Sequence, residues 1–367
     1  MNDKKNGKGK LSLNIGEFYE GDFVDDLKHG TGKLTYANGE FYEGEYFYHE
    51  RHGLGKMKYN NGDVYMGQWD ADKKHGSGKL TFKNKDSYEG KFYHGKIEGL
   101  GIMVYKNNDQ YEGEFVNNQM HGKGKMVYVN QDSYEGDWID NKRSGFGTLI
   151  LSNGEIYIGY YANNKRNGKG TMKYNNGDFY EGDWLNGKKE GNGVFKFNSG
   201  NVYDGNWKNG IRQGYGDIVI VGVGNYSGEW KDDERCGKGK MLYDNGDVYE
   251  GMWDHDKKNG KGEFLWKDVG VYIGEWLDGK RNGSGNFKCD GVGVYDGQWS
   301  YDLRSGQGQM FYNNDDSYMG EWANDEKHGQ GTYIFADGHV CEGNWIHGNF
   351  DDNKEEDEES EESEIGA

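Results

Sequence analysis

The sequence contains no proline and is poor in apolar residues. Of its 367 residues, 33% are hydrophobic, and the mean hydropathy is −1.10. On hydropathy alone such a chain is too polar to bury an ordinary core, which points to disorder. The aromatic content argues against disorder, because 11 Trp, 29 Tyr and 16 Phe concentrate a large apolar surface in few side chains. A chain without proline can also form long, uninterrupted β-ladders.

Long hydrophobic runs are missing as well. No segment approaches the roughly 18 consecutive apolar residues that a membrane-spanning helix needs. The first 16 residues lack the apolar centre of a secretory signal, so we expect a cytoplasmic protein. The three cysteines, Cys236, Cys289 and Cys341, fit no zinc or redox spacing and are expected to be reduced thiols.

An excess of positive charge is absent. The net charge is −19, and residues 351–367 contain ten acids and one lysine. Nucleic-acid binding needs a net basic face that neutralises phosphates, so we expect no nucleic-acid partner.

Glycine, in contrast, is abundant and regularly spaced, with 64 residues. The pattern Tyr-x-Gly recurs every 23 residues from Tyr19 to Tyr318, and Cys341-Glu342-Gly343 continues it. An aromatic residue stands four positions after each tyrosine position, and two glycines stand 11 and 13 positions after it, except after the last position, Cys341. A phosphate-binding loop would occur once, so Gly76-Ser77-Gly78 is part of a structural repeat rather than a ligand site.

Side-chain alternation predicts two β-strands in each repeat. Residues two apart share one face of a strand, so Tyr19, Gly21 and Phe23 point to one side. Gly32 and Leu34 belong to the matching face of the following strand. The sequence therefore predicts an all-β fold of antiparallel hairpins.

The connection after the second strand is expected to be a three-residue turn over 38–40. Gly39 would take the left-handed conformation, and Tyr36 would pair with Tyr42.

The connection between the two strands of a repeat is expected to be a six-residue loop over 24–29. This loop would pair Tyr19 with Leu34 and Phe23 with Gly30. Each aromatic residue of the +4 position would then have a glycine on both neighbouring strands and lie flat across them.

The order YEGxW, xHGxG, an apolar-x-aromatic segment and Asn-Gly resembles the MORN (membrane occupation and recognition nexus) repeat over residues 7–345. The resemblance implies an elongated, single-layer antiparallel sheet of consecutive β-hairpins, a ribbon-like solenoid. It implies about 15 repeats over residues 1–349. Residues 350–367 are expected to be a disordered acidic tail, because a block of like charges cannot pack. Residues 217–226, 266–272 and 288–295 depart from the pattern because their turns lack Asn-Gly.

Two rows of residues are candidates for structure or binding. The expected structural aromatic ladder consists of Phe23, Tyr46, Trp69, Phe92, Phe115, Trp138, Tyr161, Trp184, Trp207, Trp230, Trp253, Trp276, Trp299, Trp322 and Trp345. The candidate basic binding row consists of Lys28, Arg51, Lys74, Arg143, Arg166, Lys189, Arg212, Arg235, Lys258, Arg281, Arg304 and Lys327. Along one edge, the basic row would face anionic lipid or an acidic protein; the alternative is a row of solvated loop charges offset by acids such as Glu20.

The sequence singles out no catalytic, metal or cofactor site, because every candidate side chain belongs to the repeat. The histidines at 29, 52, 75, 121 and 328 share one position, but neighbouring copies would lie about 10 Å apart, too far to share one zinc ion. We therefore expect no enzyme and no cofactor.

The resemblance implies a non-catalytic structural scaffold that organises a cytoskeletal assembly, such as a ciliary axoneme or radial spoke, a basal body, or a cell-division ring or basal complex. Its partners would be cytoskeletal or ciliary proteins, and its location cytoplasmic and cytoskeleton-associated. The alternative is a phosphoinositide-binding linker between membrane and cytoskeleton, which depends on the basic row. A homodimer through a terminal sheet edge, near Leu11 or near Trp345, is a further expectation.

Overall fold

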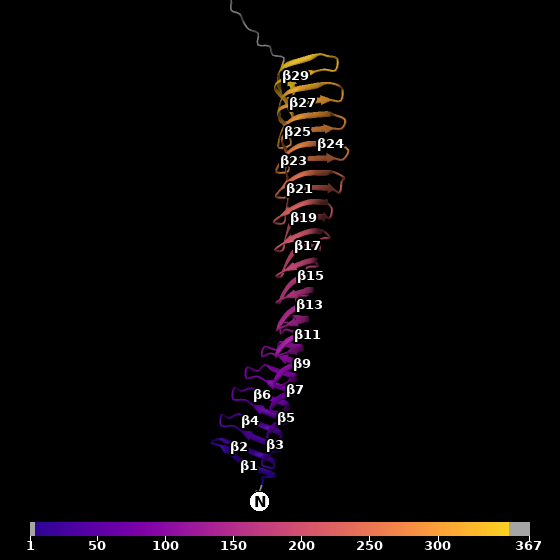
Figure 1. Ribbon diagram of the computed structural model, residues 1–367. Helices are drawn as coiled ribbons and strands as arrows, with labels where there is room; N and C mark the ends of the chain where they lie inside the picture. The colour runs from indigo at the N-terminus through magenta and orange to yellow at the C-terminus, as the bar shows by residue number, and fades with distance from the viewer. Residues whose placement is uncertain (1–3, 352–367) are drawn as a thin grey trace, which may run out of the picture. The chain divides into compact units, whose positions relative to one another are not determined.

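The computed structural model describes residues 4–351, and within these residues it consists of β-strands, turns and irregular segments without a helix. The described part accordingly has no helix that is long and apolar enough to cross a membrane. The chain divides into two units, Met1–Asn198 and Ser199–Ala367. In each unit the strands follow one another as consecutive antiparallel hairpins (Figure 1), which confirms the predicted fold class.

The first unit contains seventeen strands. They are β1 (Gly7–Asn14), β2 (Glu17–Val24), β3 (Leu27–Thr35), β4 (Phe41–Phe47), β5 (Glu50–Lys58), β6 (Val64–Asp70), β7 (Lys73–Thr81), β8 (Ser87–Tyr93), β9 (Lys96–Val104), β10 (Gln110–Val116), β11 (Gln119–Val127), β12 (Ser133–Ile139), β13 (Lys142–Ile150), β14 (Ile156–Ala162), β15 (Lys165–Lys173), β16 (Phe179–Leu185) and β17 (Lys188–Lys196).

The second unit contains fourteen strands. They are β18 (Val202–Lys208), β19 (Ile211–Ile220), β20 (Gly224–Lys231), β21 (Glu234–Tyr243), β22 (Val248–Asp254), β23 (Lys257–Trp266), β24 (Gly270–Leu277), β25 (Lys280–Cys289), β26 (Gly293–Ser300), β27 (Leu303–Tyr312), β28 (Ser317–Ala323), β29 (Glu326–Ile334), β30 (Val340–Ile346) and β31 (Asn349–Phe350).

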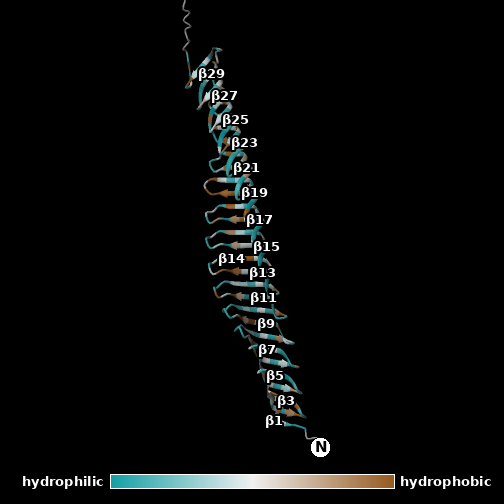
Figure 2. Cartoon of the chain, turned by 90° about the vertical axis from the view of Figure 1, so that its left-hand side faces the viewer, coloured by the Kyte–Doolittle hydropathy of each residue, from teal (hydrophilic) through white to brown (hydrophobic). Residues whose placement is uncertain are grey.

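Two strand types alternate. Even-numbered strands from β2 to β28 carry Tyr-x-Gly, and β30 carries Cys-x-Gly. These strands are called YxG strands here. Odd-numbered strands from β1 to β29 carry Gly-x-Gly and are called GxG strands. Hydrophobic residues are spread along the hairpins of both units rather than gathered in one segment (Figure 2).

The connection from a YxG strand to the next GxG strand is a tight turn, so the predicted six-residue loop over 24–29 is wrong. Val24 pairs with Leu27, and the two turn residues Asp25 and Asp26 have φ of +48° and +72°. Asp and Asn tolerate this left-handed region, which a two-residue hairpin turn requires at both positions.

A β-bulge takes up the remaining residues of the predicted loop. Tyr19 pairs with Leu34, as predicted, but Phe23 pairs with Lys28 rather than with Gly30. Three residues of β3 therefore stand opposite Asp22, and Gly30 has a φ of +61°. A glycine in this conformation allows the extra residues without breaking the flanking ladder.

The connection from a GxG strand to the next YxG strand is a turn closed by a backbone bond from Tyr36 N to Glu40 O at 3.0 Å. Gly39 has the predicted positive φ, +83°. The predicted register is wrong by two residues, because Leu34, not Tyr36, pairs with Tyr42. The turn therefore lies over 37–39, one residue earlier than expected.

The three segments without Asn-Gly keep this register. In the first of them Ile220 pairs with Gly224, and Val223 N donates to Ile220 O at 3.0 Å. The turns after Trp266 and Cys289 are built in the same way. Departure from the motif therefore changes the turn residues but not the strand pairing.

The C-terminal boundary of the array differs slightly from the expected residue 349. Strand β31 includes Phe350, and the Phe350 ring contacts Trp345 at a centroid distance of 5.4 Å. The expected disordered tail lies outside the described residues from position 352 onward.

Candidate functional site

The tyrosines of the YxG strands form the centre of the buried face. Tyr42 is 0% exposed, and its hydroxyl donates to Glu45 O at 2.9 Å. Its ring lies directly above a pair of glycines, Gly44 and Gly55, which face each other across the two strands. A Cβ added at Gly55 would overlap the Tyr42 ring, so this position requires glycine for steric reasons.

The predicted aromatic ladder is buried along its whole length, with every one of its fifteen side chains 2–5% exposed. Within each unit, tyrosines of the YxG strands lie between two ladder rings. Tyr42, for example, contacts Tyr46 at 5.1 Å and Trp69 at 5.3 Å between centroids, both edge to face. This geometry is favourable for aromatic pairs and links successive repeats within each unit.

The relation between ladder rings and glycines differs from the prediction. Trp69 pairs with Gly53 on the preceding strand but with Lys74 on the following one. Its indole Nε1 donates to Gly55 O at 3.2 Å, and the same bond recurs in other repeats. A ladder ring therefore has a glycine on one side only, and it is the tyrosine of the YxG strand that covers the glycine pair.

Two ladder positions have a hydroxyl instead of an indole. Among the described residues, the buried hydroxyls of Tyr46 and Tyr161 have no hydrogen-bond partner. A buried donor without a partner destabilises the fold, so these are weak points of the ladder.

The candidate basic row lies on the same buried face, not in loops. Each of its members stands opposite a ladder residue across the tight hairpin, as Arg51 does opposite Tyr46. The Arg51 guanidinium also lies over the ring of Trp69, with its central carbon 4.4 Å from the centroid. The two rows that the sequence suggested separately thus form one alternating stack of rings and cations.

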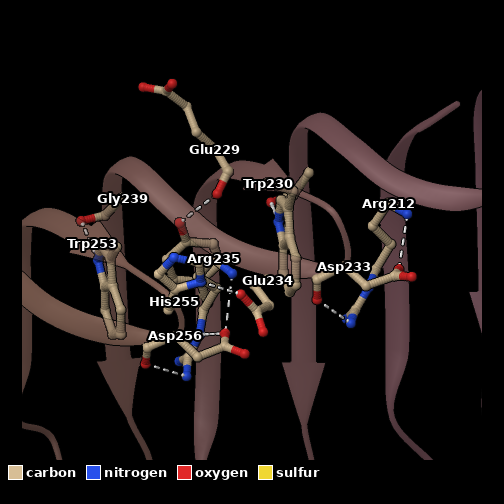
Figure 3. A network of polar contacts seen from close by, with 12 residues as sticks. Arg212, Glu229, Trp230, Asp233, Glu234, Arg235, Gly239, Trp253, His255 and Asp256 are labelled. Carbon is tan, nitrogen blue, oxygen red and sulfur yellow. Dashed lines mark hydrogen bonds and ion pairs between the residues drawn. The ribbon is translucent and has the colours of Figure 1, made fainter.

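Acidic residues of the tight turns hold the arginines in place (Figure 3). Arg235 Nε donates to Asp256 Oδ1 at 2.7 Å, and its Nη2 donates to Asp256 O at 3.0 Å. Arg212 makes the same contacts with Asp233. The side chains of the five arginines with this ion pair are 18–26% exposed. Little surface of these five guanidinium groups is therefore left for a lipid headgroup, and the acids that balance them are turn aspartates rather than Glu20 and its equivalents.

Burial changes the pKa of groups in this stack. Desolvation lowers the pKa of Lys258 to about 8, where the ammonium lies 4.0 Å from the centroid of Trp276. Desolvation raises the pKa of Tyr19 and of Tyr88 to about 12. These shifts follow from packing in a strand ladder and need no catalytic explanation.

The histidine position and the cysteines form no metal site in the described part of the chain. No group of three or more His, Cys, Asp or Glu side chains there could hold a metal ion. His29 packs against the rings of Phe47 and Tyr48, at 5.4 and 5.0 Å. The cysteines 236, 289 and 341 are free thiols.

The face opposite the aromatic stack contains a groove of about 1460 Å³ over β6 to β13. Eight glycines that pair across neighbouring strands line it, from Gly67 to Gly147. Its charged lining residues, such as Lys79 and Glu89, alternate with these glycines and hence point away from the aromatic face. We call it the glycine groove. A smaller hollow of about 650 Å³ lies over the same glycine row in β1 to β4.

Apolar side chains that no part of the core covers lie in and beside the glycine groove. Leu100 and Phe146, which line it, are 68% and 45% exposed, and Leu54 nearby is 63% exposed. All three occupy the middle position of Gly-x-Gly, where neighbouring repeats have Ser77 and Lys123. Reasoning from the sequence missed this groove. The signal was there, in apolar residues at a position whose alternation points out of the core.

A comparison with known protein families matches fifteen consecutive segments of the chain to the MORN repeat. The matched residues are 1–17, 19–41, 42–64, 65–87, 88–110, 111–133, 134–156, 157–179, 180–202, 203–218, 226–248, 249–268, 272–292, 295–317 and 318–340. A search of curated proteins found no match.

Solved structures similar to the chain include the TCP10 domain of Danio rerio CPAP, at 12% identity over 60% of this chain and 93% of that one, with a TM-score of 0.25. The SAS-4 (dCPAP) TCP domain of Drosophila melanogaster, in complex with a proline-rich motif of Ana2, is 13% identical over 55% of this chain and 90% of that one, with a TM-score of 0.23. A streptogramin B lyase is 10% identical over 72% and 81%, with a TM-score of 0.14. These TM-scores are too low to support a conclusion about this chain.

Proposed function

Because the chain belongs to the MORN repeat family, we propose that it is a non-catalytic scaffold whose glycine groove binds extended segments of partner proteins and thereby organises a cytoskeletal assembly. A role as repeat scaffold or binding protein is what the family suggests.

The observation that carries the proposal is the contrast in free surface between the two faces. The aromatic residues and most of the basic row are occupied by one another and by turn aspartates. The glycine groove, in contrast, offers exposed apolar side chains between alternating lysines and glutamates. Such a surface suits a segment with apolar anchors and charges of both signs.

The cytoskeletal setting comes from the family resemblance, and it comprises three candidates. These are a ciliary axoneme or radial spoke, a basal body, and a cell-division ring or basal complex. A cytoplasmic, cytoskeleton-associated location is part of the same proposal.

Detergent extraction of cells that express a tagged chain tests the setting. We expect the chain to remain with an insoluble axoneme, basal body or ring after the membranes are removed. Release of the chain together with the lipids would contradict the scaffold hypothesis and favour the alternative, a phosphoinositide-binding linker.

Groove variants test the binding site. Leu100→Lys and Phe146→Lys should abolish retention on the insoluble structure, because a buried charge in the contact is costly. Val129→Lys is the matched control, since Val129 is 62% exposed and does not line the groove. Retention of all three variants would show that the partner binds elsewhere.

A further inference from the structure

The first and last long strands are complementary halves of one repeat. Strand β1 is a GxG strand, and among residues 4–351 it pairs with β2 and with no YxG strand on its other side. Strand β30 is a YxG strand, and within residues 4–351 it pairs with β29 and, over two residues, with β31. One edge thus ends in a GxG strand and the other in a YxG strand, and these two strand types pair throughout the repeats.

Strand β1 has the same backbone conformation as the GxG strands that pair with a preceding YxG strand. Gly7 has a φ of +81°, which matches the +61° of Gly30 at the same repeat position. At Gly30 the bulge faces Asp22 of the preceding strand, whereas a Cβ at Gly7 would meet no atom within 4 Å. Leu11 is partly exposed, although Leu34 at the equivalent position is only 6% exposed. Within residues 4–351, the edge therefore has a core residue, Leu11, that is not fully covered.

Strand β30 is open along its first half. Strand β31 pairs with Trp345 and Ile346, and Asp351 N donates to Asn344 O at 2.9 Å, so within the described residues Val340 to Gly343 have a neighbour on one side. Val340 is 56% exposed, and Cys341 is partly exposed although it stands at the position of the buried tyrosines.

Charge distinguishes between the ways in which these edges can pair. Inside the chain, Glu20 pairs with Lys33, and Lys10 forms an ion pair with Glu20 at 3.0 Å. The same register places Lys10 opposite Glu342 when β1 meets β30. A symmetric pairing of two β1 strands about Gly9 would bring lysines together, and a symmetric pairing of two β30 strands about Glu342 would bring carboxylates together.

We infer that β1 of one copy adds to the open edge Val340–Gly343 of β30 in a second copy. In the register of the repeats, Gly9 lies opposite Gly343, Lys10 opposite Glu342, and Leu11 opposite Cys341. Because the two edges are different surfaces, the contact leaves one free edge at each end and joins further copies head to tail. This association is independent of the glycine groove and of the proposed cytoskeletal function.

Disulfide trapping tests the pairing. In a chain with Cys236→Ser and Cys289→Ser, the added change Leu11→Cys places a thiol opposite the native Cys341 of the next copy. Directly paired residues of neighbouring strands lie within disulfide reach. We expect mild oxidation to give a ladder of covalent multimers that disappears with Cys341→Ser. The control Ser12→Cys, one residue away and on the opposite face, should give none.

Two outcomes would overturn the inference. A covalent dimer of the parent chain without Leu11→Cys would indicate symmetric contact of two Cys341 edges. Failure of the Leu11→Cys chain to form multimers at high protein concentration, while its circular dichroism is that of the parent, would exclude head-to-tail pairing.

Charge reversal gives a second, non-covalent measurement. Lys10→Glu and Glu342→Lys should each weaken self-association by about fivefold in analytical ultracentrifugation, and the double variant should restore it. Both side chains are exposed, so the variants should fold. Additive weakening without restoration would contradict the proposed register.

Discussion

The two faces of the sheet differ in how constant their residues are from one repeat to the next. On the aromatic face, all fifteen ladder positions hold a buried aromatic side chain, and rings, cations and turn aspartates contact one another from repeat to repeat. On the groove face, the middle position of Gly-x-Gly varies from Thr31 through Leu54 and Ser77 to Phe146. A position that is buried between repeats must repeat, whereas an exposed one can vary, even where it contacts a neighbouring strand as Phe146 contacts Tyr160. Stability is thus concentrated on one face, and the capacity for specific recognition on the other.

Alkaline unfolding should have the largest effect and reflect the aromatic face alone. Desolvation by burial raises the pKa of Tyr19, Tyr88 and Tyr161 to about 12. A folded pKa above the unfolded value of about 10 contributes stability that is complete below pH 10 and is lost as the pH rises through the folded pKa. We expect cooperative loss of β-structure near pH 12 by circular dichroism, together with the rise in phenolate absorbance. Ionisation of most of the 29 tyrosines near pH 10 in a still folded chain would contradict the packing.

Removal of one ladder ring tests whether the face acts locally. Trp184 contacts Tyr157 and Tyr180 edge to face and donates to Gly170 O at 3.1 Å. Trp184→Ala should destabilise its surroundings by about 3–5 kcal/mol. In an array with nearest-neighbour contacts, faster hydrogen exchange should stay within the adjacent repeats. Trp184→Phe is the control, and uniform acceleration over the whole unit would refute local coupling.

Loss of one cation tests whether the basic row supports structure. Arg235→Ala removes the stacking on Trp253, at 4.5 Å, and the bonds to Asp256. We expect a loss of about 2 kcal/mol in urea unfolding of the second unit. Asp256→Asn should cost much less, because Asn164 at the equivalent position still accepts bonds from the backbone N and the Nη2 of Arg143. Unchanged stability of Arg235→Ala would contradict a structural role of the basic row and favour its interpretation as a binding surface.

A pair of hydroxyl deletions should change stability in opposite directions. Tyr161→Phe removes a buried hydroxyl without a partner and should stabilise the first unit by about 1 kcal/mol. Tyr157→Phe removes the hydroxyl that donates to Tyr160 O at 3.1 Å and should destabilise it by a similar amount. Thermal unfolding of both variants measures the difference. Equal shifts would show that the Tyr161 hydroxyl is satisfied in solution.

A change on the groove face should have the smallest effect on stability. Leu100→Lys alters a side chain that is 68% exposed, so the free energy of unfolding should change by less than about 0.5 kcal/mol. Chemical denaturation measures this change. A clearly larger loss would mean that the groove face also stabilises the fold and would weaken the contrast between the faces.

The repeat made most of the fold predictable, but the connections were misjudged. The period and the alternation of side chains identified the two strands, the pairing of Tyr19 with Leu34 and the left-handed Gly39. The tight turn at Asp25 and Asp26 was missed because Asp, unlike Gly, does not by itself indicate a positive φ. The bulge at Gly30 then moved Lys28 from an expected loop onto a strand. One local error thus changed the interpretation of a whole row.

The candidate site was less predictable for a physical reason. A sequence shows which residues recur, and recurrence points to packing. The glycine groove depends on residues that do not recur, such as Leu100 and Phe146, and on the absence of side chains at paired glycines. A search for departures from the repeat, made with strand parity in mind, would have found the apolar members.

The tight turns have a consequence for how the chain is made. Backbone bonds such as Asp72 N to Arg51 O and side-chain bonds such as Arg51 to Asp72 join residues 21 positions apart, and the hydrogen bonds described for residues 4–351 reach no further. Ordering each repeat therefore closes only a short loop, whatever the length of the array. Low contact order favours rapid folding, which is unusual for an all-β protein. Synthesis from the N-terminus would thus add one completed hairpin at a time to an already folded edge, without waiting for the rest of the chain.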